Sequence, residues 1–498
     1  MDWFLTFDIG TTSVKTCLFD EDLKQVCESN EEYELIAGSG TIELEAQTYW
    51  QAVQNGVRSV THGRQGRVVS ITATTQGETM IPVDKQGNAL RNAIVWLDGR
   101  AEKEAGQIRQ AVGDDTFYQT TGLPDADGCC PVSKLVWIKN NEPDVYAKTH
   151  KFLLLEDYII FRLSGRYVSE KSLLSSTGYF DIVRDEYWHD ILQRMGIDEE
   201  KLPQALECGE AVGRILPEVA GDLGISQEAV VTTGAMDQFA AAVGAGNTAP
   251  GTVTESTGTA LVIGATTGKL DGSHPSRSII YRHVTKGNYM ILPICMTAGI
   301  VLKWFKDEFC KLETAQCEKE GKPVYGLLSE LAAKVPPLSD GLTVFPHFTG
   351  MLMPQKDLKA KGVFLGVGLD TKLPHFVRAI FEAVAYMLRE NIEVVEEYGV
   401  NVPEIRSLGG GAKSDVWMQI KADVTGKDIV CMDENEAASL GAAILGGVAL
   451  GRLKSLAEGY EKGNGIRKRF VPNAENKALY DKGFEKYRQL YESVKTLF

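Results

Sequence analysis

Residues Phe4–Phe19 read FLTFDIGTTSVKTCLF, and the rest of the chain is organised around this stretch. Two runs rich in β-forming residues, Phe4–Phe7 and Val14–Phe19, flank a short polar segment centred on Gly10. Alternating apolar residues interrupted by a glycine turn predict a β-hairpin. Lys24–Glu28 has the composition of a third strand. The N-terminus therefore predicts three antiparallel strands that open a domain.

The turn of this hairpin carries groups that can bind phosphate. Asp8 and Lys15 stand on its two sides, and three hydroxyl residues follow the glycine: Thr11, Thr12 and Ser13. Backbone N–H groups and hydroxyls can hold phosphate oxygens, and a carboxylate at the end of a strand can hold Mg²⁺ through water. An ordinary turn rich in Thr and Ser would contain the same residues. These residues alone leave both interpretations open.

Length and composition limit the classes of protein to consider. With 498 residues, 44% of them hydrophobic and 24% charged, the chain is expected to form two or three globular domains. Its formal net charge of −15 argues against nucleic acid as a partner, because a chain this acidic repels polyanions. A nucleotide is still allowed, since it needs only a local pocket.

The cysteines and the N-terminus predict the compartment. Nine cysteines without a CxxC pair indicate a reducing environment, and the seven histidines show no HxxxH spacing that would indicate zinc. Asp2 and Asp8 stand where a signal peptide needs a positive charge and then an apolar run, and no apolar run is long enough to span a membrane. We therefore expect a cytoplasmic protein with neither membrane nor nucleic acid as a partner.

Polar clusters follow two predicted strands in the N-terminal half. A helix is expected at Gln47–Val60, and the strand Val68–Thr74 after it ends in the cluster Thr75–Thr79. The strand Ala93–Trp96 ends in Leu97–Arg100. Because α/β proteins place binding groups at strand ends, Gln76, Glu78 and Asp98 are candidates for substrate binding.

Asp237 is the candidate catalytic carboxylate. Residues 101–230 are predicted to be mostly helical, and a short strand, Ala229–Thr233, then leads through Gly234–Gln238 into the small-residue helix Phe239–Val243. A carboxylate between a strand and a helix can also be read as an N-cap, and the helix N-terminus favours its ionised form. A weak base of this kind suffices for phosphoryl transfer, because the hydroxyl proton leaves late.

The N-terminal pattern recurs about half a chain later. Two β-rich runs, Thr252–Ser256 and Ala260–Ile263, flank Thr257-Gly258-Thr259. The sequence identity of the two halves is low, so the pattern predicts a structural duplication. We expect domains at residues 1–246 and 247–498, with a hinge in the glycine-rich stretch Gly244–Gly251.

A third glycine-centred element lies near the C-terminus. Gly409-Gly410-Gly411-Ala412 follows a predicted strand and opens a predicted helix, a placement that suits a nucleoside. Together with Gly10 and Gly258 it indicates a nucleotide gripped between two domains. The other elements expected in this half are a strand at Leu342–Phe345 and helices at Pro374–Tyr398, Asp415–Val424, Ala437–Leu450 and Glu475–Phe498.

Two other nucleotide motifs are excluded or disfavoured. Residues Gly244–Ala249 formally fit the dinucleotide fingerprint G-x-G-x-x-A, but a helix is predicted before them and a strand after them. This order is the reverse of what the fingerprint needs, which argues against an NAD-dependent dehydrogenase. The chain contains no G-x-x-x-x-G-K-[ST], which excludes a P-loop enzyme.

These motifs together resemble the FGGY family of carbohydrate kinases, and the resemblance runs essentially end to end. Asp8–Lys15 is similar to the family's first phosphate loop, Glu255–Ala260 to its second, and Gly409–Asp415 to its adenosine loop. Gly362–Val367 and His375–Glu382 fit the C-terminal signature. Pro131–Trp137 fits the other signature, except that Cys129 stands where an aromatic residue, Met, Gly or Ser is usual.

The resemblance implies an α/β fold of two actin-like (ribonuclease H-like) domains with an interdomain catalytic cleft. The N-terminal domain would bind the sugar and carry the base, and the C-terminal domain would bind the nucleotide. The implied cofactors are ATP and Mg²⁺, a homodimer is compatible with the family, and Asp237 would be the general base, with Asp8 near the metal. The implied cofactor-binding residues are Gly10, Thr11, Thr12, Ser13, Lys15, Gly258, Thr259, Gly299, Gly410, Gly411, Ala412 and Asp415; the implied substrate-binding residues are Gln76, Gly77, Glu78, Trp96, Asp98, Asp237 and Gln238.

The resemblance predicts an ATP-dependent kinase that phosphorylates a primary hydroxyl of a ketopentose such as xylulose. Glycerol kinases carry Arg and then Glu in the loop where this chain has Gly77 and Glu78, whereas Trp96–Arg100 is more like the xylulokinase loop. Glu78 and Asp98 suit sugar diols, although an ion pair with Arg100 is an alternative role for them. Glycerol, a tetritol or a ketohexose are alternative substrates, and a nucleotide-switched actin-like binding protein is the alternative class.

Overall fold

The computed structural model describes residues 1–432 and 436–498. These residues form two compact units, which we describe separately. Unit 1 contains residues 1–249, 267–290 and 436–464, and unit 2 contains residues 250–266, 291–432 and 465–498. The units thus interleave along the chain, and one of their boundaries, after Ala249, lies in the glycine-rich stretch 244–251. The division into domains at residues 1–246 and 247–498 stays a prediction.

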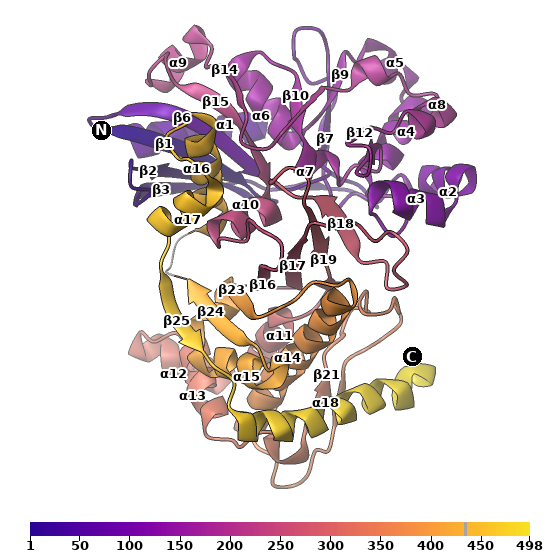
Figure 1. The fold of residues 1–498 in the computed structure, drawn as a ribbon, viewed down its shortest axis with the longest axis vertical. Helices are drawn as coiled ribbons and strands as arrows, with labels where there is room; N and C mark the ends of the chain where they lie inside the picture. The colour runs from indigo at the N-terminus through magenta and orange to yellow at the C-terminus, as the bar shows by residue number, and fades with distance from the viewer. Residues whose placement is uncertain (433–435) are drawn as a thin grey trace. The chain divides into compact units, whose positions relative to one another are not determined.

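Unit 1 is built on a six-stranded sheet in the order β14-β15-β6-β1-β2-β3 (Figure 1). The predicted hairpin is confirmed, and it pairs Asp8 with Lys15 across the ladder. Strands β1, β2 and β3 are antiparallel neighbours, whereas β6 runs parallel to both β1 and β15. The strands are β1 (Asp2–Ile9), β2 (Ser13–Phe19), β3 (Gln25–Glu32), β6 (Arg67–Thr75), β14 (Ala211–Arg214) and β15 (Val230–Met236).

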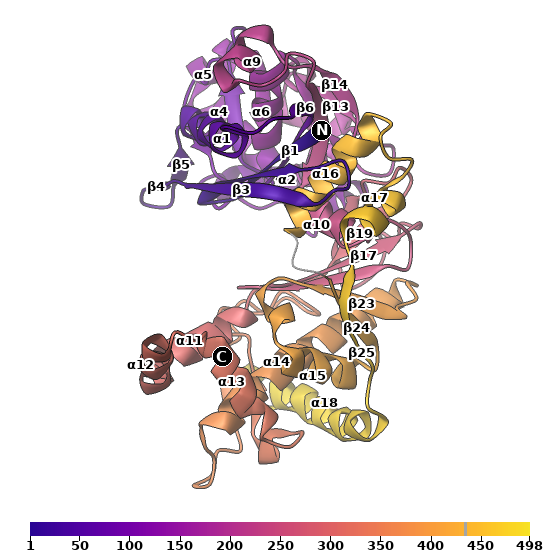
Figure 2. The same ribbon diagram turned by 90° about the vertical axis from the view of Figure 1, so that its left-hand side faces the viewer.

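Alternation along β1 and β6 gives this sheet two covered faces. Leu5 and Phe7 point into the apolar core that also contains residues of α1 (Ala46–Thr61) and α6 (Leu155–Ser164). The opposite face, with Ser70 and Thr72, lies against α16 (Ala437–Ala449), which packs on α10 (Asp237–Gly244). Figure 2 shows these two helix pairs on either side of the sheet. Asp8 alternates with Phe7 and so belongs to the α16 face.

Glycines allow α10 and α16 to approach closely. A Cβ atom on Gly244 would overlap the carbonyl oxygen of Ala437, and one on Gly441 would overlap that of Ala240. A side chain at Gly446 would collide with the hydroxyls of the sheet below. The prediction that the helix beginning at Ala437 packs closely against its neighbours is therefore confirmed.

The remaining strands of unit 1 form small sheets around the main one. The sheet β4-β5-β8-β7-β9 contains the second predicted strand of the substrate region, but β8 covers only Ala93–Ile94. The strand ends before Trp96 because the Trp96 N–H donates to the Thr79 hydroxyl instead of continuing a ladder. The other strands of these small sheets are β4 (Ile36–Ala37), β5 (Ile42–Leu44), β7 (Met80–Val83), β9 (Lys151–Leu154), β10 (Val168–Glu170), β11 (Phe180–Asp181), β12 (Glu186–Tyr187) and β13 (Gln204–Leu206). Strand β18 (Ile279–Arg282) of this unit lies outside them.

Helices of unit 1 occur where the sequence predicts a mainly helical region. Helices α4 (Pro131–Asn141) and α6 both lie within residues 101–230, the region predicted to be mostly helical. Residues 267–290 join this unit through contacts such as the Ile280 N–H to the Gly122 carbonyl, at 2.9 Å. The helices not yet named are α2 (Glu102–Val112), α3 (Asp114–Thr121), α5 (Pro143–Lys148), α7 (Lys171–Leu174), α8 (His189–Met195), α9 (Pro217–Leu223) and α17 (Leu456–Gly463).

Unit 2 repeats the strand pattern of unit 1. Strand β16 is antiparallel to β17 and parallel to β23, β23 is parallel to β24, and β25 closes this edge in the antiparallel sense. The same pattern relates β1, β2, β6, β15 and β14, which confirms the predicted duplication at the level of topology. The strands are β16 (Val253–Thr257), β17 (Leu261–Thr267), β19 (Tyr289–Leu292), β20 (Ile294–Cys295), β21 (Thr343–Phe345), β22 (Val363–Leu365), β23 (Glu404–Leu408), β24 (Asp428–Met432) and β25 (Ile466–Phe470).

The central helix of unit 2 is α14 (Leu373–Glu397), which buries residues along most of its length. It was predicted as a long amphipathic helix, and α15 (Asp415–Thr425) and α18 (Ala474–Val494) also lie where helices are expected. The last helix ends four residues earlier than predicted, because residues 495–497 form a short 3₁₀ turn. The other helices are α11 (Gly299–Phe309), α12 (Lys311–Glu320) and α13 (Val324–Ala333).

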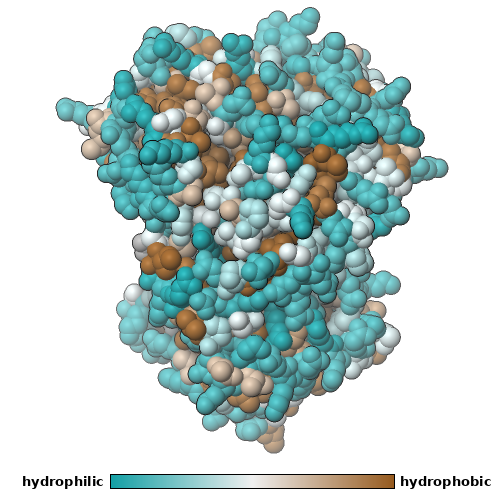
Figure 3. Space-filling view, in the orientation of Figure 1, coloured by the Kyte–Doolittle hydropathy of each residue, from teal (hydrophilic) through white to brown (hydrophobic). Residues whose placement is uncertain are grey.

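The surface is mostly polar. Exposed large apolar residues such as Leu312, Leu358 and Val471 are far apart in sequence, and on the face drawn in Figure 3 apolar side chains lie in small groups among polar ones. Across residues 1–432 and 436–498, no helix is both long and apolar enough to cross a membrane.

Candidate active site

Parallel pairing brings the predicted carboxylates of unit 1 to one edge of the sheet. Asp8 lies near the carboxyl end of β1, Glu78 follows β6, and Asp237 follows β15 directly. Because β1, β6 and β15 run parallel, the ends of all three strands meet there. Burial, together with the charges of Asp8 and Glu78, raises the pKa of Asp237 to about 7. Burial likewise raises the pKa of Asp8 to about 6.

Asp237 is the first residue of α10, and Met236 occupies the N-cap position. The Gln238 N–H donates to Asp237 Oδ1 at 2.6 Å, and the Gln238 side chain also forms a hydrogen bond to this carboxylate. Asp237 is therefore not the N-cap residue of α10, and no side-chain cap hydrogen bond is formed at the start of this helix.

The predicted first phosphate loop, residues 8–15, is held by a residue that the sequence analysis did not identify. The Tyr33 hydroxyl donates to the Gly10 carbonyl at 2.6 Å, and the Tyr33 N–H donates to the Thr12 carbonyl at 2.9 Å. The Tyr33 ring meets the edge of Tyr49, with centroids 5.2 Å apart, and the Gln76 amide approaches the Tyr49 hydroxyl at 3.4 Å. The packed pair Tyr33 and Tyr49 thus contacts both the predicted phosphate loop and Gln76, in the predicted substrate-binding loop 75–79.

The predicted substrate residue Trp96 also contacts the phosphate loop. Its indole Nε1–H donates to the Thr11 hydroxyl at 3.0 Å, and 36% of the Trp96 surface is exposed. An exposed indole can pack against a sugar while its N–H keeps a partner. Lys15, predicted to bind the nucleotide, forms an ion pair with Glu436 at 2.7 Å.

Asp98 is bound by groups of the chain itself. It is fully buried, and its oxygens accept from the Arg100 guanidinium at 2.6 and 2.8 Å and from the Ile42 N–H at 2.6 Å. The alternative role stated above, an ion pair with Arg100, is what the structure contains. Asp98 therefore shapes the loop that carries Trp96, whereas the Glu78 side chain forms a hydrogen bond with Ser176.

Lys134 is a second residue of the site that we did not predict as a binding residue. Its ammonium is fully buried and donates to three backbone carbonyls, those of Glu78 and Val95 at 3.0 Å and that of Trp96 at 3.4 Å. The Lys134 side chain of α4 thus binds the backbone of both predicted substrate-binding segments, at Glu78 and at residues 95–96. Burial lowers the pKa of Lys134 to about 8, against the opposing effect of the Glu78 charge. Glu78 itself has a positive φ of 56°, a strained conformation that needs such support.

Replacing Lys134 with methionine is expected to raise the sugar KM at least about tenfold, because each bond from a charged donor contributes ~1.5–3 kcal/mol. The ATP KM should change less than about threefold, since the predicted adenosine loop lies in unit 2. Lys139→Met is the matched control, because Lys139 lies on the same helix and bonds the Met195 carbonyl. Steady-state kinetics measure both constants, and an unchanged sugar KM in Lys134→Met would show that the loops do not need the ammonium.

In unit 2 the three segments predicted to bind the nucleotide, at Gly258, Gly299 and Gly409–Ala412, meet around residues 256–259. The Gly299 N–H donates to the Gly258 carbonyl at 2.9 Å, and a Cβ on Gly299 would overlap that oxygen. Gly409, with a positive φ of 76°, lies against Ser256, and a Cβ on Gly411 would come within 2.9 Å of the Thr257 Cβ. These glycines are required by close backbone packing, and they place Gly410 and Ala412 next to the second hairpin loop.

The predicted nucleoside residue Asp415 is exposed at the start of α15. It pairs with Lys468 of β25 at 2.6 Å, and the neighbouring Arg467 donates to the Ala412 carbonyl at 2.8 Å. Lys468 of β25 therefore compensates the negative charge of Asp415, and Arg467 binds the backbone of the same loop. Asp415 remains accessible, but its carboxylate already has a partner.

A buried ion pair lies directly below the second phosphate loop. Lys421 Nζ and Glu255 Oε1 are 2.6 Å apart, and neither side chain has any exposed surface. Lys421 also donates to the Thr257 hydroxyl at 2.7 Å, and the Thr257 hydroxyl donates to Glu255 at 2.8 Å. Ser407 of β23 donates to the same carboxylate. The cluster ties α15 and β23 to the strand that ends in Gly258.

The residues of unit 1 fit a magnesium ion that arrives with phosphate. Within the described part of the chain no group of three or more His, Cys, Asp or Glu side chains could hold a metal ion. Mg²⁺ keeps several waters and usually takes one or two carboxylates together with substrate phosphates. Asp8, half-buried beside the hydroxyl-rich loop, supplies a carboxylate of that kind.

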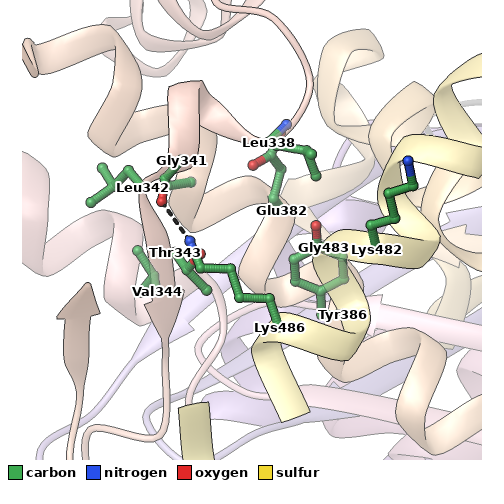
Figure 4. A pocket seen from close by; sticks show the side chains of 11 residues that line it. Leu338, Gly341, Leu342, Thr343, Val344, Glu382, Tyr386, Lys482, Gly483 and Lys486 are labelled. Carbon is green, nitrogen blue, oxygen red and sulfur yellow. Dashed lines mark hydrogen bonds between the residues drawn. The ribbon is translucent and has the colours of Figure 1, made fainter. Parts of the chain in front are cut away.

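A cavity of about 190 Å³ lies in unit 2, away from every predicted site residue. Figure 4 shows that α14, β21 and α18 contribute its walls and that Lys486 reaches across to the Gly341 carbonyl, at 2.9 Å. The backbone of residues 338–341 above it has positive φ throughout. Glu382, at its floor, is held by Leu338, Ser339, Arg378 and Tyr480.

Comparisons with known proteins agree with this geometry. Residues 3–244 match the model of the FGGY family of carbohydrate kinases, N-terminal domain, and residues 254–450 match that of the C-terminal domain. The chain is 28% identical over its whole length to a xylulose kinase of Bacillus subtilis, covering 98% of that protein, and 29% identical over 91% of its length to a gluconokinase of the same organism, covering 88% of it. The crystal structure of a ligand-bound xylulose kinase from Lactobacillus acidophilus superposes with a TM-score of 0.90 at 25% identity and covers 99% of both chains.

Proposed function

The chain belongs to the FGGY family of carbohydrate kinases, and from that premise we propose that it transfers the γ-phosphoryl group of ATP to a primary hydroxyl of a neutral ketopentose such as xylulose. It is a phosphotransferase with an alcohol group as acceptor, of the actin-like ATPase fold. The observation that carries the proposal is the set of carboxylates Asp8, Glu78 and Asp237 at one edge of the unit 1 sheet.

In the proposed mechanism, Asp237 accepts the proton of the sugar hydroxyl. The hydroxyl oxygen forms a bond to the γ-phosphorus, the bond from phosphorus to the bridging oxygen breaks, and ADP carries away the electron pair. The carboxylate of Glu78 and the indole of Trp96 orient the sugar, while Thr11, Thr12 and Ser13 hold phosphate oxygens. Mg²⁺, held near Asp8, would neutralise charge on the phosphates.

The charges near the site favour a neutral sugar over a sugar acid such as gluconate. Asp8, Glu78 and Asp237 are all acidic, and the charges of Asp8 and Glu78 raise the pKa of Asp237. The nearby cations are already engaged, Arg100 with Asp98 and Glu43, and Lys134 with backbone carbonyls. An anionic substrate would therefore meet repulsion without a free counter-charge.

The packing around Gly77 argues against a glycerol kinase. A Cβ at this position would come within 2.9 Å of Met236 Sδ and 3.4 Å of Ser176 Oγ. The arginine that glycerol kinases have in this loop would need Met236 to move. A larger open-chain sugar is therefore the better substrate than glycerol.

A screen of ADP release with Mg·ATP tests this proposal over ketopentoses, ketohexoses, tetritols, glycerol and gluconate. We expect a ketopentose to give the highest kcat/KM, at least about tenfold above gluconate or glycerol, which corresponds to ~1.4 kcal/mol of transition-state binding. A preference for gluconate would contradict the electrostatic argument. If no sugar stimulates ADP release, the alternative of a nucleotide-switched actin-like protein is supported.

We also propose that the protein works in the reducing cytoplasm. All nine of its cysteines are unpaired in the structure, which is the state expected there.

A further inference from the structure

Strand β15 contains a bulge just before the catalytic carboxylate. In the pairing with β6, Thr232 lies opposite Thr72 and Ala235 opposite Thr74, so two residues of β15 face one residue of β6. The second of these is Gly234, and a Cβ there would overlap the Ala73 carbonyl oxygen. A bulge leaves a backbone group without its ladder partner and re-aims the residues that follow. Asp237 is three residues further on.

Two buried acids from other elements hold the backbone of this bulge. The Gly234 N–H donates to Glu156 Oε1, on α6, at 2.8 Å. Two residues later, the Met236 N–H donates to the Ser172 hydroxyl at 3.1 Å, and Ser172 donates to Glu170 Oε1 at 2.9 Å. Glu156 thus fixes the Gly234 N–H directly, and Glu170 fixes the Met236 N–H through the Ser172 hydroxyl.

The contacts assign different charge states to the two acids. Glu170 accepts from the Ser172 N–H and hydroxyl, the Leu173 N–H and the Cys208 thiol, which together stabilise a carboxylate. Glu156 accepts from Gly234 alone, and its other oxygen is buried without a partner. Within residues 1–432 and 436–498 neither acid forms an ion pair.

A second buried charge at Glu156 would be costly. Burial, and then the charge of Glu170, raise the pKa of Glu156 well above its ordinary value. An ionised oxygen without a partner in a dry interior costs more than a neutral O–H there. Glu156 is therefore the neutral acid of the pair and offers one carbonyl oxygen to the bulge.

We propose that Glu156, as a neutral carboxylic acid, is a positioning residue whose Oε1 fixes the Gly234 bulge and thereby directs Asp237 toward the substrate hydroxyl. Ser172 and Glu170 provide the parallel support at Met236. The proposal rests on the proposed function, because it assumes that Asp237 accepts the substrate proton.

The test compares Glu156→Gln with Glu156→Leu in the full-length enzyme. Glutamine has the shape of the neutral acid and keeps an oxygen for the Gly234 N–H, so its kcat should stay within about threefold of the wild type. Leucine removes the acceptor, and its kcat should fall at least about tenfold, with the ATP KM unchanged within about threefold. The acid limb of the pH profile of kcat/KM should move in the leucine variant and stay in place in the glutamine variant.

The second test variant is Ser172→Ala, which removes a single hydroxyl and its bond to the Met236 N–H. We expect its kcat also to fall several-fold, and its effect should be less than additive with that of Glu156→Leu, because both act on one segment. If Glu156→Leu does not fold, Ser172→Ala carries the test, and an unchanged kcat in that variant overturns the proposal. So does a glutamine variant as impaired as the leucine variant. Asp237→Asn separates the positioning role of Glu156 from the proposed function, because an active Asp237→Asn enzyme would contradict the proposed function itself.

Discussion

Replacing Asp237 with asparagine is expected to lower kcat by ~10²–10⁴-fold, the usual contribution of a general base. Asparagine keeps the size of the side chain and an oxygen for the Gln238 N–H, but it cannot accept the proton of the sugar hydroxyl. The affinity for ATP should stay within a few-fold. Single-turnover ADP formation and a nucleotide-binding titration measure the two effects, and near-normal turnover would show that another group is the base.

The pH dependence of the wild-type enzyme provides an independent check. Burial raises the pKa of Asp237 to about 7, with a contribution from the Asp8 charge, and burial raises the pKa of Asp8 to about 6. The base must be ionised, so kcat/KM for the sugar should rise with pH through this range. The acid limb should be absent from the residual activity of Asp237→Asn.

Stability should respond in the opposite direction. The folded pKa of Asp237 lies above the ordinary value of 3.8, so the folded protein binds this proton more tightly than the unfolded chain. Its contribution to the free energy of unfolding is complete below about pH 4 and is lost as the pH rises toward 7. Asp237→Asn should therefore have a higher Tm than the wild type at pH 8 and a similar Tm at pH 4, as measured by thermal unfolding without Mg²⁺. A lower Tm at pH 8 would contradict the assigned burial cost.

Local patterns were sufficient to predict the frame of this fold. The hairpin at Phe4–Phe19 and its repeat at Thr252–Ile263 follow from alternation around a glycine, because strand and turn are set by neighbours in sequence. Parallel pairing of β1, β6 and β15 then places Asp8 and Asp237 at one edge. The carboxylate pair was predictable for the same reason.

The residues that hold the loops were not predictable, because their partners are distant in sequence. Lys134 bonds carbonyls of residues 78, 95 and 96, and Tyr33 bonds Gly10. In the sequence, Lys134 stands in a predominantly apolar helix and Tyr33 follows a strand. Neither position indicates more than an ordinary core or surface residue. Asp98 shows the reverse case, since a polar residue at a strand end is a reasonable binding candidate until Arg100 is seen to occupy it.

Glu255 and Lys421 illustrate this limit most clearly, and they allow the sharpest stability prediction. Lys421 is a buried charged residue of α15, and only the fold reveals that it lies 2.6 Å from the carboxylate of Glu255 on β16. Removing one partner leaves a fully buried charge uncompensated. Lys421→Met is therefore expected to lower the free energy of unfolding by ~3–5 kcal/mol.

The double variant Glu255→Leu/Lys421→Met should recover at least about half of that loss, because buried ion pairs can often be replaced by apolar residues of similar volume. Lys427→Met is the matched control: Lys427 pairs with Glu396 at a partly exposed site, so its loss should cost at most ~1 kcal/mol. Denaturant unfolding measures all three variants. The ATP KM of Lys421→Met should also rise, since the cluster fixes Thr257 beside the second phosphate loop. Equal destabilisation by Lys421→Met and Lys427→Met would mean that the buried pair contributes no more than a surface one.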